Sequence, residues 1–137
     1  MVTKKIIATI EARLASTRLP GKVLLPLAGV PSLQFMIERL RHSRLISEIV
    51  IATSINSEND ELERLAKILG VSIYRGSEEN VLQRVVDAAK FFSADIIVQL
   101  TGDCPLIDSN IVDECIEAYL SGDYDYVANE LIRTYPI

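Results

Sequence analysis

The sequence predicts an α/β fold, a mostly parallel sheet with helices on both faces. Short runs rich in β-branched residues alternate along the chain with longer amphipathic stretches, which is typical of repeated βαβ units. The short runs are apolar throughout, which indicates strands that are buried on both faces. The chain is 49% hydrophobic but only 6% aromatic, so we expect a core of Ile, Leu, Val and Ala.

The spacing of apolar residues predicts the elements of the first half. Residues 6–10 (IIATI) predict a first buried strand, and residues 32–42 predict a helix because their apolar positions recur at helical spacing. Residues 48–53 (EIVIAT) predict a second strand. We expect the next helix to run from Ser57, whose hydroxyl can cap free amide groups, to residue 69, because Gly70 favours a helix end.

The second half continues the same alternation. Residues 71–74 predict a short third strand, and residues 78–92 predict a helix with a broad apolar stripe. Residues 95–100 (DIIVQL) predict a fourth strand. Asp108 can cap a helix that runs to residue 120, and residues 124–128 predict a fifth strand. We therefore expect one compact domain over residues 1–137.

Composition excludes several classes of protein. The net charge of −5 argues against a general nucleic-acid surface, which needs an excess of cations. The first apolar run ends at Glu11, far short of a signal peptide or membrane span, so we expect a soluble, cytoplasmic protein. Cys104 and Cys115 are too few for a disulfide framework, and we expect both thiols to be reduced and partly buried. His42 is expected at the surface.

The loop after the first strand, residues 12–22 (ARLASTRLPGK), is the first candidate site, because open parallel sheets bind ligands beyond the carboxyl ends of their strands. Its cations, hydroxyls and glycine are Arg13, Ser16, Thr17, Arg18, Gly21 and Lys22. Such groups can form a cradle for phosphate. The glycine spacing fits neither a dinucleotide fingerprint nor a Walker A loop. A solvated basic loop is the alternative.

The loop after the fourth strand, residues 101–108 (TGDCPLID), is the second candidate site. A carboxylate at a strand end suits Mg²⁺, which takes one or two carboxylates together with phosphate oxygens and water. Asp103 is the better candidate because Asp108 lies where the next helix needs a cap. The alternative for Asp103 is a turn-forming residue. We expect both loops to meet at the same sheet edge.

At these residues the chain resembles a known family. The segments ARLASTRLPGKVLLPLAGVP and TGDCPLID resemble the cytidylyltransferases that activate acidic sugars, the CMP-KDO and CMP-acylneuraminate synthetases. The spore-coat polysaccharide biosynthesis branch is the most similar, also over YRGSEENVLQR and the final NELIRTYPI. The resemblance implies a three-layer, Rossmann-like (GT-A-like) nucleotidyltransferase fold. It also implies Mg²⁺-dependent transfer of CMP from CTP to a hydroxyl of an acidic or amino sugar, with pyrophosphate release, in polysaccharide or cell-surface glycan biosynthesis.

The resemblance also implies roles for individual residues. The residues that match the triphosphate loop of the family are Arg13, Ser16, Arg18 and Lys22. Arg75 matches an arginine near the cytosine base, and Asp103 matches a metal-binding aspartate. Among these, Arg13, Lys22 and Asp103 are the expected catalytic residues. Thr101 stands where the KDO and sialic-acid enzymes have a glutamine or a similar residue. Gln99 is expected inside the strand, so we do not assign Gln99 to the cytosine base.

The family is longer than this chain, so we expect residues 1–137 to be the N-terminal portion of a longer domain. An incomplete sheet exposes apolar surface, and we therefore expect a homodimer or a partner that supplies the rest. Two other functions stay open. One is an enzyme that uses another nucleotide, either a nucleotidyltransferase or a glycosyltransferase. The other is a shortened, non-catalytic module for nucleotide binding or assembly.

Overall fold

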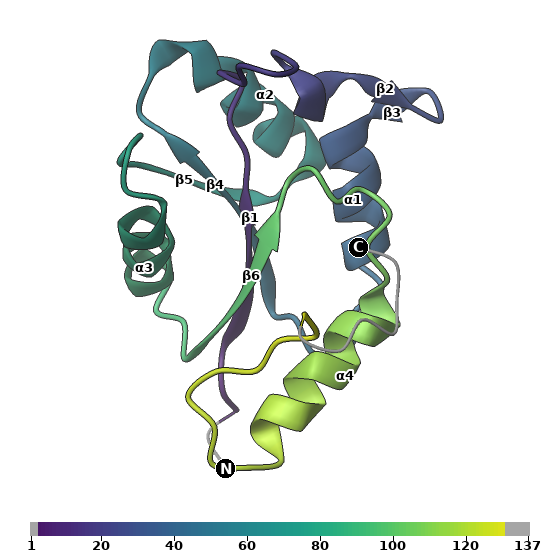
Figure 1. Cartoon of the computed structure of the whole chain (residues 1–137), viewed down its shortest axis with the longest axis vertical. Coiled ribbons are helices and arrows are strands. Elements are labelled where there is room, and N and C mark those ends of the chain that lie inside the picture. Colours follow the sequence, from purple (N-terminus) through teal and green to yellow (C-terminus); the bar gives the residue numbers. More distant parts are fainter. Residues whose placement is uncertain (1–2, 131–137) are drawn as a thin grey trace.

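A computed structural model describes residues 3–130 of the chain. Its centre is a parallel four-stranded sheet in the order β5-β4-β1-β6 (Figure 1). The strands are β1 (Ile6–Glu11), β4 (Glu48–Ser54), β5 (Ser72–Gly76) and β6 (Ile96–Thr101). Two short strands, β2 (Pro26–Leu27) and β3 (Val30–Pro31), form a separate antiparallel pair. The predicted parallel sheet is confirmed.

Helices cover both faces of this sheet (Figure 1). The helices are α1 (Ser32–Leu40), α2 (Asp60–Leu69), α3 (Val81–Phe91) and α4 (Ser109–Leu120), with short 3₁₀ turns at Lys22–Leu24 and Ser57–Asn59. The larger core cluster lies on the side of α1, α2 and α4, and the smaller one lies under α3. The chain therefore has the expected three layers.

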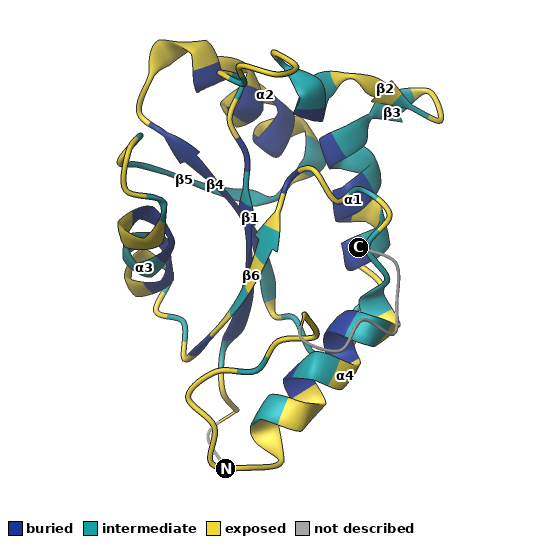
Figure 2. Ribbon diagram, viewed as in Figure 1, coloured by how far each residue is buried: buried dark blue, intermediate teal, exposed yellow. Residues whose placement is uncertain are grey.

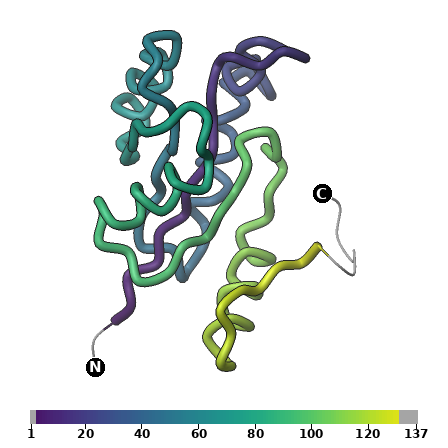
Figure 3. The backbone as a smooth tube through the Cα atoms, turned by 60° about the vertical axis from the view of Figure 1, so that its left-hand side comes forward, coloured from purple at the N-terminus to yellow at the C-terminus, as the bar shows by residue number. Residues whose placement is uncertain are grey.

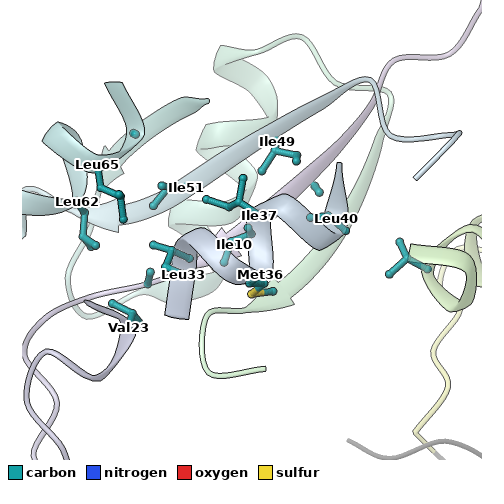
Figure 4. Packing of buried hydrophobic residues seen from close by; sticks show 14 of the residues in the cluster. Ile10, Val23, Leu33, Met36, Ile37, Leu40, Ile49, Ile51, Leu62 and Leu65 are labelled. Carbon is teal, nitrogen blue, oxygen red and sulfur yellow. The ribbon is translucent and has the colours of Figure 1, made fainter. Parts of the chain in front are cut away.

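The core is aliphatic, as its composition predicts. Side chains of β1 and β4 meet the inner faces of α1 and α2 in the larger cluster (Figure 4), where Ile10, Leu33 and Ile51 are fully buried. On the other face, Ile7 and Val50 pack against Ala88 and Ala89 of α3. Burial is densest along the central strands (Figure 2), because β1 and β4 have a strand on either side and helices above and below.

Capping residues explain where the helices begin and end. Helix α2 begins at Asp60 rather than at Ser57, which lies in the preceding 3₁₀ turn. Gly70 ends this helix with a φ of 64°, a conformation that costs glycine little. Helix α3 begins at Val81 because the Asn80 side chain caps it, accepting from the Gln83 amide at 2.9 Å. Asp108 caps α4 through the Asn110 amide at 2.8 Å, as predicted.

The predicted fifth strand at residues 124–128 is wrong. The segment follows α4 in an irregular conformation, and Tyr124 and Tyr126 are 55% and 75% exposed. Figure 3 shows it running up from the lower end of α4 as an irregular trace. Its alternating apolar residues suit a strand, but a strand also needs a neighbouring backbone to pair with, and none of the described residues supplies one.

Three smaller expectations concern the surface and the membrane. No helix within residues 3–130 is long and apolar enough to cross a membrane. Both cysteines are free, and Cys115 is half-buried as expected, whereas Cys104 is exposed because it lies in the turn that projects beyond β6. His42 is exposed, as predicted.

Candidate functional site

The two candidate loops begin side by side at the carboxyl edge of the sheet. Strands β1 and β6 are direct neighbours, and their register ends with Glu11 opposite Thr101. The Gly102 amide then donates to the Glu11 carbonyl at 2.8 Å, so the pairing continues one residue into the second loop. The predicted meeting of residues 12–22 and 101–108 at one edge is therefore confirmed.

Gly102 allows this close crossing. A Cβ atom at this position would lie 2.8 Å from the Glu11 carbonyl oxygen and 3.2 Å from the Ala12 Cβ. The first of these distances is shorter than real Cβ contacts, and backbone cannot swing aside as the end of a side chain can. The glycine before Asp103 is thus a packing requirement of the site.

Lys22 and Asp103 join the two loops. The Lys22 Nζ lies 3.1 Å from the Asp103 Oδ2, and the two side chains are 31% and 48% exposed. Hydrogen bonds from the Thr101 hydroxyl and from Lys22 lower the pKa of Asp103 despite some desolvation. Asp103 is therefore ionised at neutral pH and can exchange Lys22 for another cation.

Asn59 fixes the shape of the first loop and was not predicted. Its fully buried side chain accepts from the Leu14 amide at 2.9 Å and donates to the Ser54 Oγ at 2.7 Å. The Leu14 carbonyl then accepts from the amides of Ser16 and Gly21, which curls the loop back on itself. Gly21 has a φ of 67°, which suits the tight return.

The remaining residues of the predicted triphosphate loop are more exposed. Arg13 donates from Nη1 to the Glu78 Oε1 at 2.8 Å, and its side chain is half-exposed. Ser16 accepts from the Leu19 amide at 3.3 Å and so shapes the loop. Arg18 is exposed and its guanidinium contacts no partner within residues 3–130. The loop thus presents two paired cations and one unpaired cation.

Arg75 lies apart from these residues. It sits on β5, at the opposite edge of the sheet from β6, and three strand spacings separate the two strands by about 14 Å. Its guanidinium donates to the carbonyls of Ser54, Ile55 and Asn56 and pairs with Asp60 and Glu63, which raise its pKa. Arg75 therefore ties β5 to the loop that precedes α2.

Two further charged residues, Glu78 and Arg84, stand next to the first loop and were also not predicted. Arg84 is 2% exposed, and burial lowers its pKa while Glu11 and Glu78 oppose that effect. The Ser54 hydroxyl and Arg13 lower the pKa of Glu78 against desolvation. One sequence signal existed: Arg84 falls on the apolar face of its helix, between Val81 and Val85.

The residues present fit Mg²⁺ only together with a phosphate ligand. No group of three His, Cys, Asp or Glu side chains in the described part of the chain could hold a metal ion. Asp103 supplies the carboxylate that meets Lys22 of the cationic loop. Because Mg²⁺ commonly takes one or two protein carboxylates and completes its shell with phosphate oxygens and water, a single aspartate beside a phosphate cradle suits it.

Two open depressions elsewhere on the surface do not include this site. One, of about 380 Å³, lies at the amino ends of the strands beside Leu40 and Gly70. The other, of about 390 Å³, lies between α1 and the start of α4, beside Phe35 and Asn110. Neither is lined by Arg13, Lys22 or Asp103, whose partly exposed side chains lie at the sheet edge instead.

Curated relatives are similar over most of this chain. The spore coat polysaccharide biosynthesis protein SpsF of Bacillus subtilis is 39% identical over 130 residues, which cover 90% of this chain and 54% of SpsF. A 3-deoxy-manno-octulosonate cytidylyltransferase of Geobacter sulfurreducens is 39% identical over 113 residues, which cover 81% of this chain and 44% of that enzyme. The chain thus spans about half the length of the curated relatives it matches.

Solved structures and a family model agree with these relatives. A cytidylyltransferase of Leptospira borgpetersenii superposes with a TM-score of 0.79 at 43% identity, over 88% of this chain and 50% of that one. A CMP:2-keto-3-deoxy-manno-octonic acid synthetase complexed with CTP superposes with a TM-score of 0.74 at 28% identity, over 85% and 48%. The family model for cytidylyltransferases matches residues 7–134. The chain therefore belongs to the cytidylyltransferase family and has its Rossmann-like fold.

Proposed function

We propose that this chain carries the CTP site of a cytoplasmic enzyme that transfers CMP to a sugar hydroxyl and releases pyrophosphate. The contact between Lys22 and Asp103 supports the proposal, because it brings a cation suited to phosphate against a carboxylate suited to Mg²⁺ at the sheet edge. An acidic or amino sugar is the proposed acceptor, in polysaccharide or cell-surface glycan biosynthesis. The names of the 3-deoxy-manno-octulosonate enzyme and of SpsF support both points.

The first loop holds the triphosphate in this proposal. Arg18 is exposed and unpaired within residues 3–130, so it can meet an incoming phosphate without breaking a contact. Lys22 exchanges Asp103 for phosphate oxygens, and Arg13 offers its exposed guanidinium edge. Ser16 shapes the turn and adds a hydroxyl. Bonds between such cations and phosphate are charge-assisted and short, which makes them strong.

Asp103 is the proposed ligand of Mg²⁺, together with phosphate oxygens and water. When bound, the ion neutralises phosphate charge and polarises the reacting group. Asp103 is ionised and half-exposed, so it needs little rearrangement to serve this role.

The transfer itself requires positioning and charge neutralisation. The sugar hydroxyl oxygen attacks the α-phosphorus, the bond from that phosphorus to the bridging oxygen breaks, and pyrophosphate leaves while the hydroxyl proton passes to water. Arg13 and Lys22 hold the β- and γ-phosphates and stabilise the negative charge that grows on the leaving pyrophosphate. Arg75 is the proposed neighbour of the cytosine, for which it would exchange one of its bonds to loop carbonyls.

A product assay tests this function. The 137-residue chain is incubated with CTP, Mg²⁺ and a panel of acidic and amino sugars, and both pyrophosphate and the CMP-sugar are quantified. We expect pyrophosphate and CMP-sugar in equal amounts with one sugar class, and none with Lys22→Ala. If CTP raises the melting temperature but no sugar yields product, the chain is a nucleotide-binding module instead.

A further inference from the structure

Four charged side chains lie together on the α3 side of the sheet edge, directly beside the first loop. This edge cluster consists of Glu11 at the end of β1, Arg13, Glu78 before α3, and Arg84 within α3. Arg13 pairs with Glu78 at 2.8 Å, and Arg84 bonds the carbonyl of the residue before Glu78, while Glu11 and Glu78 oppose the lowering of the Arg84 pKa by burial. Lys22 and Asp103 form a separate ion pair, so the edge cluster is a second group of charges, which shares Arg13 with the proposed phosphate site.

Arg84 is the fixed centre of the edge cluster. It is 2% exposed, and its Nη1 donates to the Ser77 carbonyl at 2.6 Å. The turn before α3 is shaped around it, because a Cβ at Gly76 would lie 3.2 Å from the Arg84 Cγ. A buried guanidinium is unfavourable without nearby negative charge, and Glu11 and Glu78 supply that charge. The Ser77 carbonyl directly precedes Glu78 in the chain, so Arg84 fixes the turn that carries Glu78.

Glu78 in turn holds Arg13. Its Oε1 accepts from the Arg13 Nη1 at 2.8 Å, and only 26% of the Glu78 side chain is exposed, against 50% for Arg13. The Nε and Nη2 groups of Arg13 have no partner within residues 3–130. One edge of the guanidinium is thus fixed by a half-buried carboxylate, and the other edge is left free.

We propose that Glu78, on a turn fixed by Arg84, is a positioning residue that holds Arg13 with its free guanidinium edge available to the polyphosphate. The proposal rests on the proposed function, because Arg13 is taken as a triphosphate ligand. An arginine on a loop loses side-chain freedom when it binds phosphate, and a carboxylate that orients it beforehand reduces that loss. Glu78 itself does not touch the ligand.

A competing interpretation makes the opposite prediction. If Glu78 only competes with phosphate for Arg13, removing the carboxylate charge would strengthen phosphate binding, because no ion pair would have to break first. If Glu78 positions Arg13, the same change weakens binding, and only while Arg13 is present. The sign of the effect and its dependence on Arg13 therefore separate the two.

The test is a double-mutant cycle measured by calorimetry. Wild type, Glu78→Gln, Arg13→Ala and the double variant are titrated with inorganic tripolyphosphate and with CTP, each with Mg²⁺. We expect Glu78→Gln to weaken binding of both ligands by about tenfold in the presence of Arg13 and by less than about twofold in its absence. Glu79→Gln is the matched control, because Glu79 is an exposed neighbour that pairs with no other residue within residues 3–130 and carries the same charge. It should leave both affinities within about twofold.

Each outcome decides the proposal. Tighter binding by Glu78→Gln, no change, or an equal loss with and without Arg13 overturns the positioning role. If the cycle behaves as expected with tripolyphosphate but CTP is not preferred over other nucleotides, positioning stands and the CTP function fails. If CTP is preferred but the cycle shows no coupling, the function stands and positioning fails. If wild type binds neither ligand, both are wrong.

A second variant is used if Glu78→Gln impairs folding. If Glu78→Gln melts far below wild type, Glu78→Asp replaces it, since it keeps a negative charge near Arg84 but is one methylene shorter toward Arg13. The same Arg13-dependent loss of tripolyphosphate affinity is expected. An affinity equal to that of wild type would contradict the positioning role.

Discussion

Asp103 and Lys22 are 81 positions apart in the chain, yet their side chains meet at 3.1 Å. Neither residue is held by the core. Lys22 opens a 3₁₀ turn in the first loop, and Asp103 follows the glycine that allows the two loops to cross. The ion pair is therefore a consequence of two neighbouring strands ending together, and it is exposed enough to exchange for ligands.

Asp103→Asn tests the metal role at this scale. The change keeps the size of the side chain but removes its charge, so we expect CTP binding to lose its dependence on Mg²⁺ while the melting temperature stays near that of wild type. Calorimetry with and without Mg²⁺ measures it. Asp108→Asn is the control in the same loop, because asparagine also caps helices well and should retain the Mg²⁺ effect. Unchanged Mg²⁺ dependence in Asp103→Asn contradicts the metal assignment.

Residues that could bind ligands were predictable, whereas those that position them mostly were not. Arg13, Lys22 and Asp103 carry charge at strand ends, which the sequence displays directly. Asn59 and Glu78 act through contacts with residues 45 and 65 positions away, and such contacts depend on the folded arrangement. Polar residues before a helix are common, so nothing in the sequence distinguished these two.

At the scale of the secondary-structure elements, the loops that follow β1 and β6 cross so closely that there is no room for a side chain at Gly102. We expect Gly102→Ala to lower the free energy of unfolding by about 1–3 kcal/mol, because the new methyl group meets the Glu11 carbonyl and forces backbone to move. CTP affinity should fall with it. Denaturant unfolding and calorimetry measure the two effects.

Gly122→Ala is the matched control for this change. The atoms nearest to its added Cβ belong to the ring of Tyr124, which is 55% exposed and can turn away. Its stability should stay close to that of wild type. Equal stability of the Gly102 variant and wild type would mean that the close crossing does not constrain the loops.

Helix α4 is attached through a buried carboxylate. The Asp113 side chain is 2% exposed, and it accepts from the Ser43 hydroxyl and from the Arg44 amide. Burial alone raises the pKa of Asp113, but these hydrogen bonds, the Leu45 amide and the Arg44 charge outweigh it and leave the pKa lowered. The ionised form is thus the one that stabilises the fold.

Asp113→Asn should therefore destabilise the fold in a pH-dependent way. At pH 7 we expect a loss of about 1–3 kcal/mol in the free energy of unfolding. Since the folded pKa lies below the unfolded value of about 3.9, the stabilisation is present above that value and is lost as pH falls through the folded pKa. Urea unfolding between about pH 3 and pH 7 should show the variant and wild type converge in acid. A constant difference would contradict this account.

The elements of the fold could largely be predicted, since continuous apolar runs and helical spacing depend on local sequence. The exception, residues 124–128, shows the limit. Its alternating apolar residues fit a strand, but a strand needs a neighbouring strand to pair with. Sequence periodicity carries no information about which backbones lie side by side.

For the molecule as a whole, the sheet within residues 3–130 has two edge strands, β5 and, beside the candidate loops, β6. Ile97 on this strand is 38% exposed, and unpaired strand edges associate readily. We expect the chain to form homodimers, and Ile97→Lys to shift it toward monomer, because an edge lysine opposes strand pairing. Sedimentation velocity measures the shift. Leu82→Lys, at an exposed position of α3, is the control, and an equal effect of both would contradict an edge interface.

The central claim is that residues 12–22 bind the triphosphate of CTP, and calorimetric titration with Mg²⁺ and CTP tests it most directly. We expect wild type to bind CTP more tightly than UTP, GTP or ATP. Lys22→Ala and Arg13→Ala should each weaken CTP binding by about 10- to 100-fold, since charge-assisted contacts contribute about 1.5–3 kcal/mol. Lys90→Ala, an exposed lysine in α3, should leave the affinity unchanged. Unchanged CTP affinity in both loop variants would contradict the account.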